Sequence, residues 1–224
     1  MDAKQFVTEL SKIRLNGVFN PYADRCTVHD LADAPKVRRA NLRSYLRAIQ
    51  ELETDTIWMG RDLGYRGGRR TGLALTDERH LSVMPTSYPG SQPCRATRGP
   101  AVAERTAAEI WQVILTLSRP PLLWNVFPFH PHEPGQPLTN RRFTSAELNE
   151  VDELNRELIS WLGIRRIISI GQDAAKYASS FGVEVECVRH PSYGGVKDFR
   201  AGIKILYGPL MSNLSEVELQ NALF

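Results

Sequence analysis

Segments in which apolar residues have the spacing of a helix alternate along the chain with segments that have the pattern of a strand. Apolar residues recur every three to four positions, the spacing of helices that bury one side, in residues 2–14, 37–53, 101–118, 145–162 and 173–181. The clearest of these is 145–162, because Thr144 or Ser145 can cap its start and Gly163 can end it. Between the helices lie four shorter runs of strand type, at residues 56–59, 122–127, 166–170 and 183–188.

This alternation predicts a parallel sheet with helices on both faces. Three of the runs are almost continuously apolar, as strands covered on both faces are. We therefore expect an α/β fold with three layers (α/β/α) around a central, mostly parallel four-stranded sheet. Ligands of such sheets bind at the carboxyl ends of the strands. Those ends carry Asp62, Asn125 and His190, so we expect these three side chains at one edge.

Composition and charge set outer limits on the function. The chain has 224 residues, of which 42% are hydrophobic and 24% charged, which fits one globular domain over residues 1–224. Its formal net charge of +3 permits nucleic-acid binding without arguing for it. Cys26, Cys94 and Cys187 lie too far apart for a zinc ribbon or a four-cysteine iron–sulfur site, so we expect no metal and no cofactor. No run resembles a membrane span or a signal peptide, so we expect a cytoplasmic protein without a membrane partner.

A glycine-rich segment, residues 60–72, follows the first strand. Its backbone and its arginines Arg66, Arg69 and Arg70 suit close approach to a phosphodiester. The segment is not a P-loop, because no Gly-Lys-Ser/Thr follows, and its glycine spacing is not that of a dinucleotide site. A surface loop with solvated arginines explains the arginines equally well. Asp62, just beyond the expected strand end, favours a functional role.

Two further polar segments follow strand ends. Asn125 offers a paired donor and acceptor, as needed to read a base edge, although an Asn in this position often satisfies backbone groups. His130 and His132 raise the alternative of a metal-dependent hydrolase, which the prolines around them disfavour. His190 stands only two residues before Ser192, and no Gly-x-Ser-x-Gly elbow exists, which argues against a Ser-His-Asp hydrolase.

The order and spacing of these segments resemble the uracil-DNA glycosylase superfamily. Gly60-Arg61-Asp62-Leu63-Gly64 is similar to its first motif, which reads Gly-Gln-Asp-Pro-Tyr in family one and Gly-Glu-Ala-Pro-Gly in family four. His190-Pro191-Ser192 resembles its second motif, and Asn125 falls where the uracil-reading Asn lies. Between them, Thr139-Asn140-Arg141 and Gly171-Gln172-Asp173-Ala174 are similar to further family segments.

The resemblance implies an enzyme that hydrolyses the N-glycosidic bond of a flipped-out uracil in DNA and leaves an abasic site. Asp62 would orient and activate the attacking water, and His190 would donate a hydrogen bond to the base oxygen on which charge develops. Asn125 would read the base edge. The other expected substrate contacts are Gly60, Arg61, Gly64, Tyr65 and Leu75. The expected DNA contacts, with Ser192 gripping the flanking phosphate, are Arg66, Arg69, Arg70, Pro191, Ser192, Tyr193 and Gly194.

Several positions depart from the family pattern. Leu75 replaces the aromatic that stacks on uracil, and Gly64 replaces the tyrosine that excludes thymine. We therefore expect an open wall at Gly64 unless Tyr65 fills it, and hypoxanthine or xanthine as second substrates. Tyr193 or Val196 is expected to fill the gap left by the flipped base. The missing cysteines indicate a divergent branch without an iron–sulfur cluster.

Two other classes of function stay open. A non-catalytic binder of uracil-containing DNA could use the same fold, but the presence of both Asp62 and His190 favours an enzyme. A metal-dependent hydrolase could use His130 and His132, and a chelator would separate it from a metal-free glycosylase. We expect a monomer whose partner is DNA containing uracil or another deaminated base. Residues 1–36 and 205–224 receive no functional assignment.

Overall fold

The computed structural model describes residues 1–208 of the chain. Its centre is a parallel four-stranded sheet of β2 (Thr56–Asp62), β3 (Leu122–Phe127), β5 (Arg166–Ile170) and β6 (Glu184–Val188). The spatial order of the strands is β3-β2-β5-β6. A second, antiparallel pair of β1 (Val18–Phe19) and β4 (His130–Pro131) was not predicted from the pattern.

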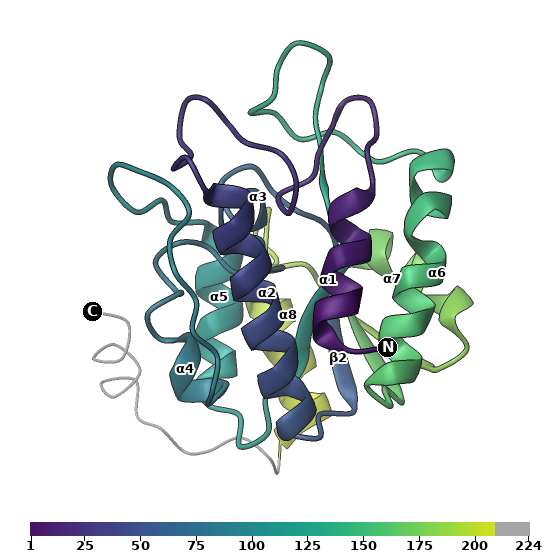
Figure 1. Cartoon of the computed structure of the whole chain (residues 1–224). Coiled ribbons are helices and arrows are strands. Elements are labelled where there is room, and N and C mark those ends of the chain that lie inside the picture. The colour runs from purple at the N-terminus through teal and green to yellow at the C-terminus, as the bar shows by residue number, and fades with distance from the viewer. Residues whose placement is uncertain (209–224) are drawn as a thin grey trace.

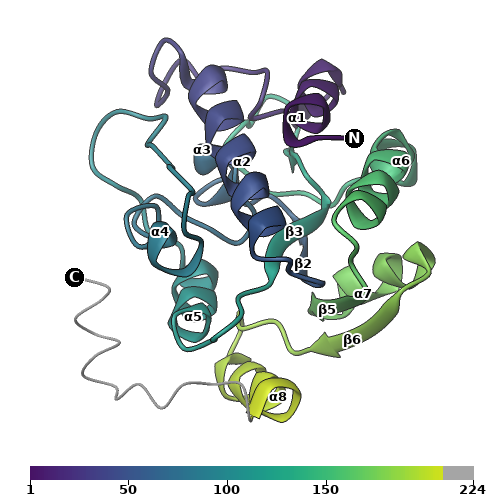
Figure 2. The same ribbon diagram turned by 60° about the horizontal axis from the view of Figure 1, so that its bottom comes forward.

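Helices cover both faces of the sheet, which confirms the expected α/β/α fold (Figures 1 and 2). They are α1 (Ala3–Lys12), α2 (Ala34–Glu51), α3 (Gly68–Thr71), α4 (Met84–Ser87), α5 (Arg105–Ile114), α6 (Ser145–Trp161), α7 (Gln172–Ala178), the 3-10 helix η1 (Ser179–Phe181) and α8 (Val196–Tyr207). Crossovers between parallel strands are right-handed as a rule. In the strand order β3-β2-β5-β6, the crossover from β2 to β3 leads toward one edge of the sheet, and the crossover from β3 to β5 leads back toward the other edge. This reversal places α5 and α6 on opposite faces.

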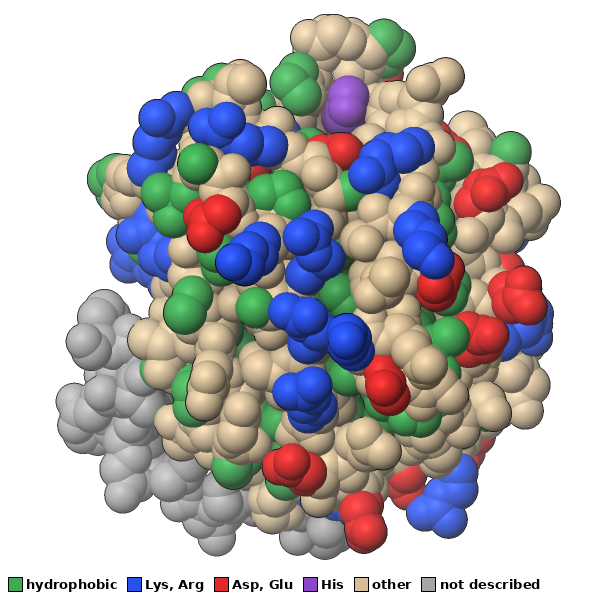
Figure 3. All heavy atoms as spheres, viewed as in Figure 1, with side chains coloured by type: hydrophobic (Ala, Val, Ile, Leu, Met, Phe, Trp, Pro, Cys, Tyr) green, Lys and Arg blue, Asp and Glu red, His purple; other side chains and the backbone are tan. Residues whose placement is uncertain are grey.

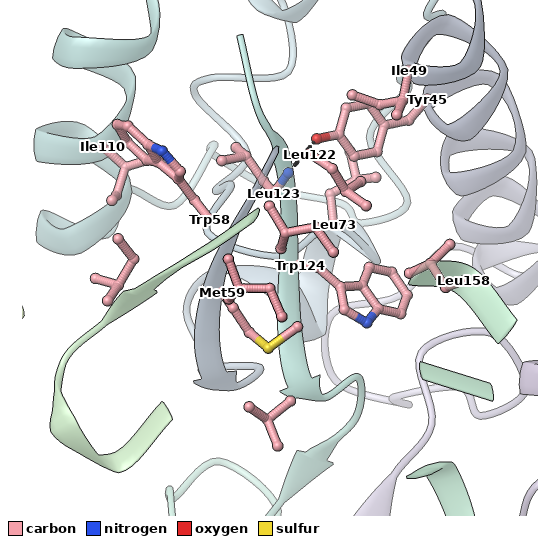
Figure 4. Close-up of a cluster of buried hydrophobic side chains, with 14 of the residues drawn as sticks. Tyr45, Ile49, Trp58, Met59, Leu73, Ile110, Leu122, Leu123, Trp124 and Leu158 are labelled. Carbon is pink, nitrogen blue, oxygen red and sulfur yellow. Dashed lines mark hydrogen bonds between the residues drawn. The ribbon is translucent and has the colours of Figure 1, made fainter. Parts of the chain in front are cut away.

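The alternation of side chains along the central strands fixes the two helix layers. Trp124 of β3 faces α1 and α6, where its indole N–H donates to Asn155 Oδ1 at 2.9 Å and its ring lies 5.7 Å from that of Phe6. Trp58 of β2 faces the other way and packs edge-on against Phe199 and Tyr207 of α8. Figure 4 shows Trp58 and Trp124 on opposite sides of the strands. The apolar strands β2, β3 and β5 are therefore buried on both faces, whereas β6 is largely half-buried or exposed.

The predicted helices correspond to α1, α2, α5, α6 and α7, with ends shifted by a few residues. Thr144 caps α6 in a capping box with Glu147. The sequence analysis missed α8, although its buried Phe199, Ile203 and Tyr207 recur every four residues; Gly202, a poor helix former, lies among them. A Cβ at Gly202 would lie 3.0 Å from Val188 Cγ1, so this glycine lets α8 approach β6 closely. The strand predicted at residues 56–59 continues to Asp62, so Asp62 is the last residue of β2 and does not follow it.

No helix among residues 1–208 is long and apolar enough to cross a membrane. The single domain over residues 1–224 stays a prediction. Within the unassigned segment 205–224, residues 209–224 lie outside the described part of the chain.

Candidate active site

The carboxyl edge of the sheet brings Asp62, Asn125 and His190 together. The connections that leave β2 and β5 lead in opposite directions across the sheet, and open α/β sheets bind ligands outside the strand ends at such a point. Gly60 pairs with Asn125 in the parallel register, and residues two apart on a strand share a face, so Asn125 and Asp62 point to the same face. His190 packs over the end of β5, where a Cβ at Gly171 would lie 3.1 Å from His190 Cβ.

Asn125 lies directly against the backbone of Gly60. A Cβ at Gly60 would overlap Asn125 Oδ1 and would lie 3.1 Å from Leu75 Cδ2, so only glycine fits there. The Oδ1 atom is buried and has no hydrogen-bond partner among the described residues. A buried acceptor without a donor costs about 1–3 kcal/mol. An N–H group of a ligand would satisfy this atom, which makes Asn125 the strongest candidate for a residue that reads a base.

Asp62 is held by ion pairs that run around the end of β2. Arg61 donates from Nε to Asp62 Oδ2 at 2.6 Å and from Nη1 to Asp173 Oδ2 at 3.1 Å. Asp173 Oδ2 also lies 3.0 Å from Arg142 Nη2. Burial raises the pKa of Asp62, and the Arg61 guanidinium opposes that rise. Arg61 uses Oδ2, so the other carboxylate oxygen, Oδ1, can orient a water molecule.

His190 is positioned as a neutral hydrogen-bond donor. The backbone N–H of Ser192 donates to His190 Nδ1 at 3.1 Å, and the Ser192 hydroxyl lies 2.8 Å from the same atom. Because Nδ1 accepts, the neutral ring carries its hydrogen on Nε2. Burial lowers the pKa of His190, and the nearby Arg189 and Arg61 lower it further. The Nε2–H group can therefore donate to a base oxygen without a charged imidazole.

The wall beside Gly64 is not open, which corrects the expectation from the sequence. Glu104 precedes α5, and its carboxyl group lies over the backbone that follows Asp62. A Cβ at Gly64 would lie 2.9 Å from Glu104 Oε1, and a Cβ at Gly67 would overlap Oε2. Burial and the neighbouring carboxylate of Asp77 raise the pKa of Glu104 to about 7. Glu104 therefore places a carboxyl group that titrates near neutral pH where an open space was expected.

Two other expected contacts sit around this wall. Tyr65 is half-buried, and its backbone N–H donates to Asn140 Oδ1 at 3.1 Å. Leu75 is also half-buried and has a φ of 53°, a left-handed conformation that is unusual for leucine. Strained residues of this kind concentrate at functional sites. In this conformation the side chain of Leu75 lies against Gly60, beside the unpaired atom of Asn125.

Two arginines expected to contact DNA are buried inside the protein, which corrects that expectation. Arg69 lies over the ring of Phe19, with its guanidinium carbon 4.0 Å from the ring centroid. Arg70 Nε lies 3.0 Å from Glu78 Oε2. Arg69 is 2% and Arg70 5% exposed, so neither reaches a phosphate at the surface. Arg66 is exposed and remains the arginine of this segment that can do so.

The segment after His190 presents an exposed aromatic ring. Pro191 is buried and Ser192 half-buried, whereas Tyr193 is 95% exposed and Gly194 is also exposed. Tyr193 has a φ of 50°, again a left-handed conformation that disfavours a bulky side chain. Val196, the other candidate to fill the gap of a flipped base, begins α8 and is half-buried. Tyr193 is therefore the better placed of the two for contact with DNA.

His130 serves to join two segments of the site. Its Nδ1–H donates to the carbonyl of Leu63 at 2.7 Å, which ties the chain after β3 to the chain after Asp62. Burial lowers the pKa of His130 to about 4, so the ring is neutral. His132 stacks on it at a centroid distance of 6.0 Å. Within residues 1–208, no group of three or more His, Cys, Asp or Glu side chains could hold a metal ion.

Two residues of this site escaped the sequence analysis. Glu104 fell inside the predicted helix 101–118, and no motif marks it. Asp173 belongs to a family-like turn, but nothing in that turn indicates its pairing with Arg61, which lies 112 positions away. Only the folded chain brings these carboxylates to the edge where Asp62 lies.

Comparisons with known proteins bear on the fold. No protein-family model matches the sequence, and no curated protein matches it. Among solved structures, the chain is similar to the crystal structure of wild-type SMUG2 from Pedobacter heparinus, with a TM-score of 0.61 at 14% identity. The alignment covers 93% of this chain and 99% of that chain. The similarity at this identity concerns the fold, and the chain has the uracil-DNA glycosylase-like α/β/α fold.

Proposed function

We propose that this protein is a DNA glycosylase that removes uracil from DNA by hydrolysis. The observation that carries the proposal is the buried, unpaired Oδ1 of Asn125, which lies on the same sheet face as Asp62. SMUG2, the structural neighbour, is a member of the uracil-DNA glycosylase superfamily, and this supports the class of reaction. The free Nε2–H of His190 at the same edge supports it further.

In the proposed reaction, the bond between C1′ of deoxyribose and N1 of uracil breaks, and its electron pair leaves with the base. His190 Nε2–H donates to the base oxygen on which negative charge develops. Asn125 accepts the N3–H of uracil at Oδ1 and donates from Nδ2 to the neighbouring carbonyl. Asp62 orients a water molecule, whose oxygen bonds to C1′. The water proton ends on the departed uracil anion, and the DNA keeps an abasic site.

The breadth of base choice follows from the walls of the pocket. Because Glu104 lies beside Gly64, the acceptance of several bases cannot be argued from an empty space at Gly64. Hypoxanthine and xanthine stay proposed second substrates, because each carries a ring N–H beside a carbonyl that Asn125 can read. Thymine has the same ring N–H and carbonyl, so its rejection depends on the space around its methyl group.

Oligonucleotides that carry uracil, hypoxanthine, xanthine or mismatched thymine test the proposal directly. After incubation, alkaline cleavage at abasic sites measures excision from each strand. We expect excision of uracil, unchanged by a metal chelator. Loss of activity with the chelator would favour the metal-dependent alternative, and tight binding without abasic sites would favour a non-catalytic binder.

Replacement of Asp62 by Asn provides the internal control of this experiment. The substitution removes the charge and the base but changes the shape little, so single-turnover excision should fall by roughly two to four orders of magnitude. Binding of uracil-free DNA should persist. The matched variant Asp152→Asn, on the surface of α6, should excise uracil at the parent rate. Parent-like turnover of Asp62→Asn would remove Asp62 from the mechanism.

A further inference from the structure

The outer face of α2 carries a row of basic side chains outside the site described above. Lys36, Arg39, Arg43 and Arg47 recur every three or four residues, so they share the side of the helix that faces away from the core. At 1.5 Å per residue, this α2 stripe is about 16 Å long. Figure 3 shows Lys and Arg side chains gathered down the middle of this face, over α2.

The charges of the α2 stripe are not neutralised by neighbours. Within residues 1–208, no ion pair engages any of its four members. Several surface arginines elsewhere do have carboxylate partners; they are Arg141, Arg142, Arg156, Arg165, Arg166 and Arg200. The exposed carboxyl groups nearest on this helix, Asp33 and Glu51, lie at its two ends. Like charges four residues apart repel one another, so a polyanion laid along the stripe would relieve this repulsion.

The start of the α2 stripe is anchored beside the candidate active site. Arg38, next to the stripe, donates from Nε to the carbonyl of Arg70 at 2.9 Å, and Asn41 Nδ2 donates to the carbonyl of Thr71 at 3.3 Å. The segment they hold leads within a few residues to Leu75, which lines the edge with Asn125. The stripe therefore begins near the sheet edge that would hold the base and runs away from it along α2.

We propose that the α2 stripe binds phosphates of the DNA strand that continues from the base pocket. The identity of the polyanion rests on the proposed function. One row of cations matches one row of phosphates, and a strand with a phosphate every 3.4 Å of axis would place about four or five along the stripe. The guanidinium of Arg39 is already positioned, because it donates to the carbonyl of Tyr22. Arg43 and Arg47 lie further along the stripe, so a long strand contacts them and a short substrate does not reach them.

The test compares Arg43→Ala/Arg47→Ala with Lys176→Ala/Lys204→Ala, a control that removes the same charge from exposed lysines of two other helices, α7 and α8. Alanine is the best helix former, so the substitutions leave α2 intact. Fluorescence anisotropy measures binding of uracil-free 5-mers and 30-mers, single-stranded and duplex, between 50 and 200 mM salt. We expect the stripe variant to reduce the salt slope on 30-mers by about two, which is roughly a tenfold smaller loss of affinity across that range. Binding of 5-mers should not change.

Different results would contradict the role of the α2 stripe and the proposed glycosylase function. Equal salt slopes for the stripe variant, the control and the parent on 30-mers would overturn the role of α2. So would an equal fall of the slope in both double variants, since net charge alone would then explain it. Uracil excision from a 5-mer by the parent tests the proposed function separately. If no excision occurs but the slope falls only in the stripe variant, the stripe stands and the glycosylase assignment fails.

Discussion

The polar side chains at the carboxyl edge are fixed in place, but each keeps one hydrogen-bonding atom available for a ligand. Asn125 has a buried acceptor without a donor, Asp62 gives one carboxylate oxygen to Arg61, and His190 keeps its Nε2–H because Ser192 occupies Nδ1. Buried polar groups in folded proteins are normally paired. Asn125 Oδ1 breaks this rule at the sheet edge, so it is the atom that a ligand is best placed to complete.

Asn125→Asp should weaken uracil excision by on the order of a hundredfold, because an acceptor replaces the Nδ2–H donor that faces a base carbonyl. Single-turnover rates on uracil and cytosine oligonucleotides measure the effect. Slow excision of cytosine is expected at low pH, where a protonated carboxyl group can meet the different edge of that base. Equal uracil rates in the variant and the parent would show that Asn125 does not read the base.

Arg61→Gln should move the acid limb of the pH–rate profile to higher pH. In the proposed mechanism, turnover requires the ionised form of Asp62, whose pKa is raised by burial and held down by Arg61. Without the guanidinium the pKa of Asp62 rises, so the carboxylate protonates and activity falls at a higher pH than in the parent. Asp173→Asn keeps the contact between Arg61 and Asp62 and should shift the limb less. An unchanged limb in Arg61→Gln would mean that Arg61 does not tune Asp62.

Helices and strands approach one another closely where glycine allows it. Gly60 leaves room for the amide of Asn125, Gly171 for the Cβ of His190, and Gly202 for Val188 of β6. At the start of α5, the backbone N–H of Glu104 donates to Asp77 Oδ2 at 2.6 Å, which fixes where its carboxyl group meets the segment after β2. These contacts join elements that lie far apart in the sequence and shape the candidate site.

Glu104→Gln should stabilise the protein at alkaline pH. The pKa of Glu104 in the folded state is about 7, above its ordinary value of 4.5, so the folded state binds the proton more tightly than the unfolded state. Stability is therefore lost as pH rises from about 4.5 to 7, and the uncharged Gln avoids this loss. We expect a gain of about 1–3 kcal/mol at pH 8.5 and little at pH 4.5.

Urea unfolding of the parent and of Glu104→Gln at both pH values measures this difference. Glu150→Gln, at the exposed start of α6, is the matched control and should change stability equally little at both. A gain for Glu104→Gln that does not depend on pH would contradict the raised pKa, and would assign the effect to packing alone.

Over the molecule as a whole, exposed features that suit DNA converge on the carboxyl edge. The ring of Tyr193 projects from the segment after His190, and the α2 stripe begins on the neighbouring side. Arg66 lies on the loop between β2 and α3. A strand with its base in the crevice would have an aromatic ring at hand to replace that base in the stack.

Tyr193→Ala should lower excision from duplex DNA by tenfold or more and from single strands much less. The ring is expected to fill the space of the flipped base, and only a duplex requires that unstacking cost of a few kcal/mol to be offset. Rates on the same sequence in single-stranded form, paired with adenine and mismatched with guanine, measure the difference. Tyr193→Phe should restore duplex activity. An equal fall on single and double strands would assign Tyr193 a structural role.

The local pattern was enough to predict the layers of this fold and to indicate the edge where the candidate site lies. Helical and strand periods are properties of neighbouring residues, and burial on both faces leaves an apolar strand little freedom. The strand ends therefore indicated Asp62, Asn125 and His190 before any contact was known. The sequence analysis missed α8, although Phe199, Ile203 and Tyr207 recur at helical spacing. Gly202 among them is a poor helix former, and the close approach of β6 explains why a glycine stands there.

Long-range contacts decided what the pattern left open. Arg66, Arg69 and Arg70 are equally basic in the sequence, yet Arg66 is exposed while the other two are buried. Their burial depends on Phe19 and on Glu78, which no local period connects to them. The wall at Gly64 likewise depends on Glu104, forty positions away, because the space beside a glycine belongs to whichever side chain the tertiary fold brings there.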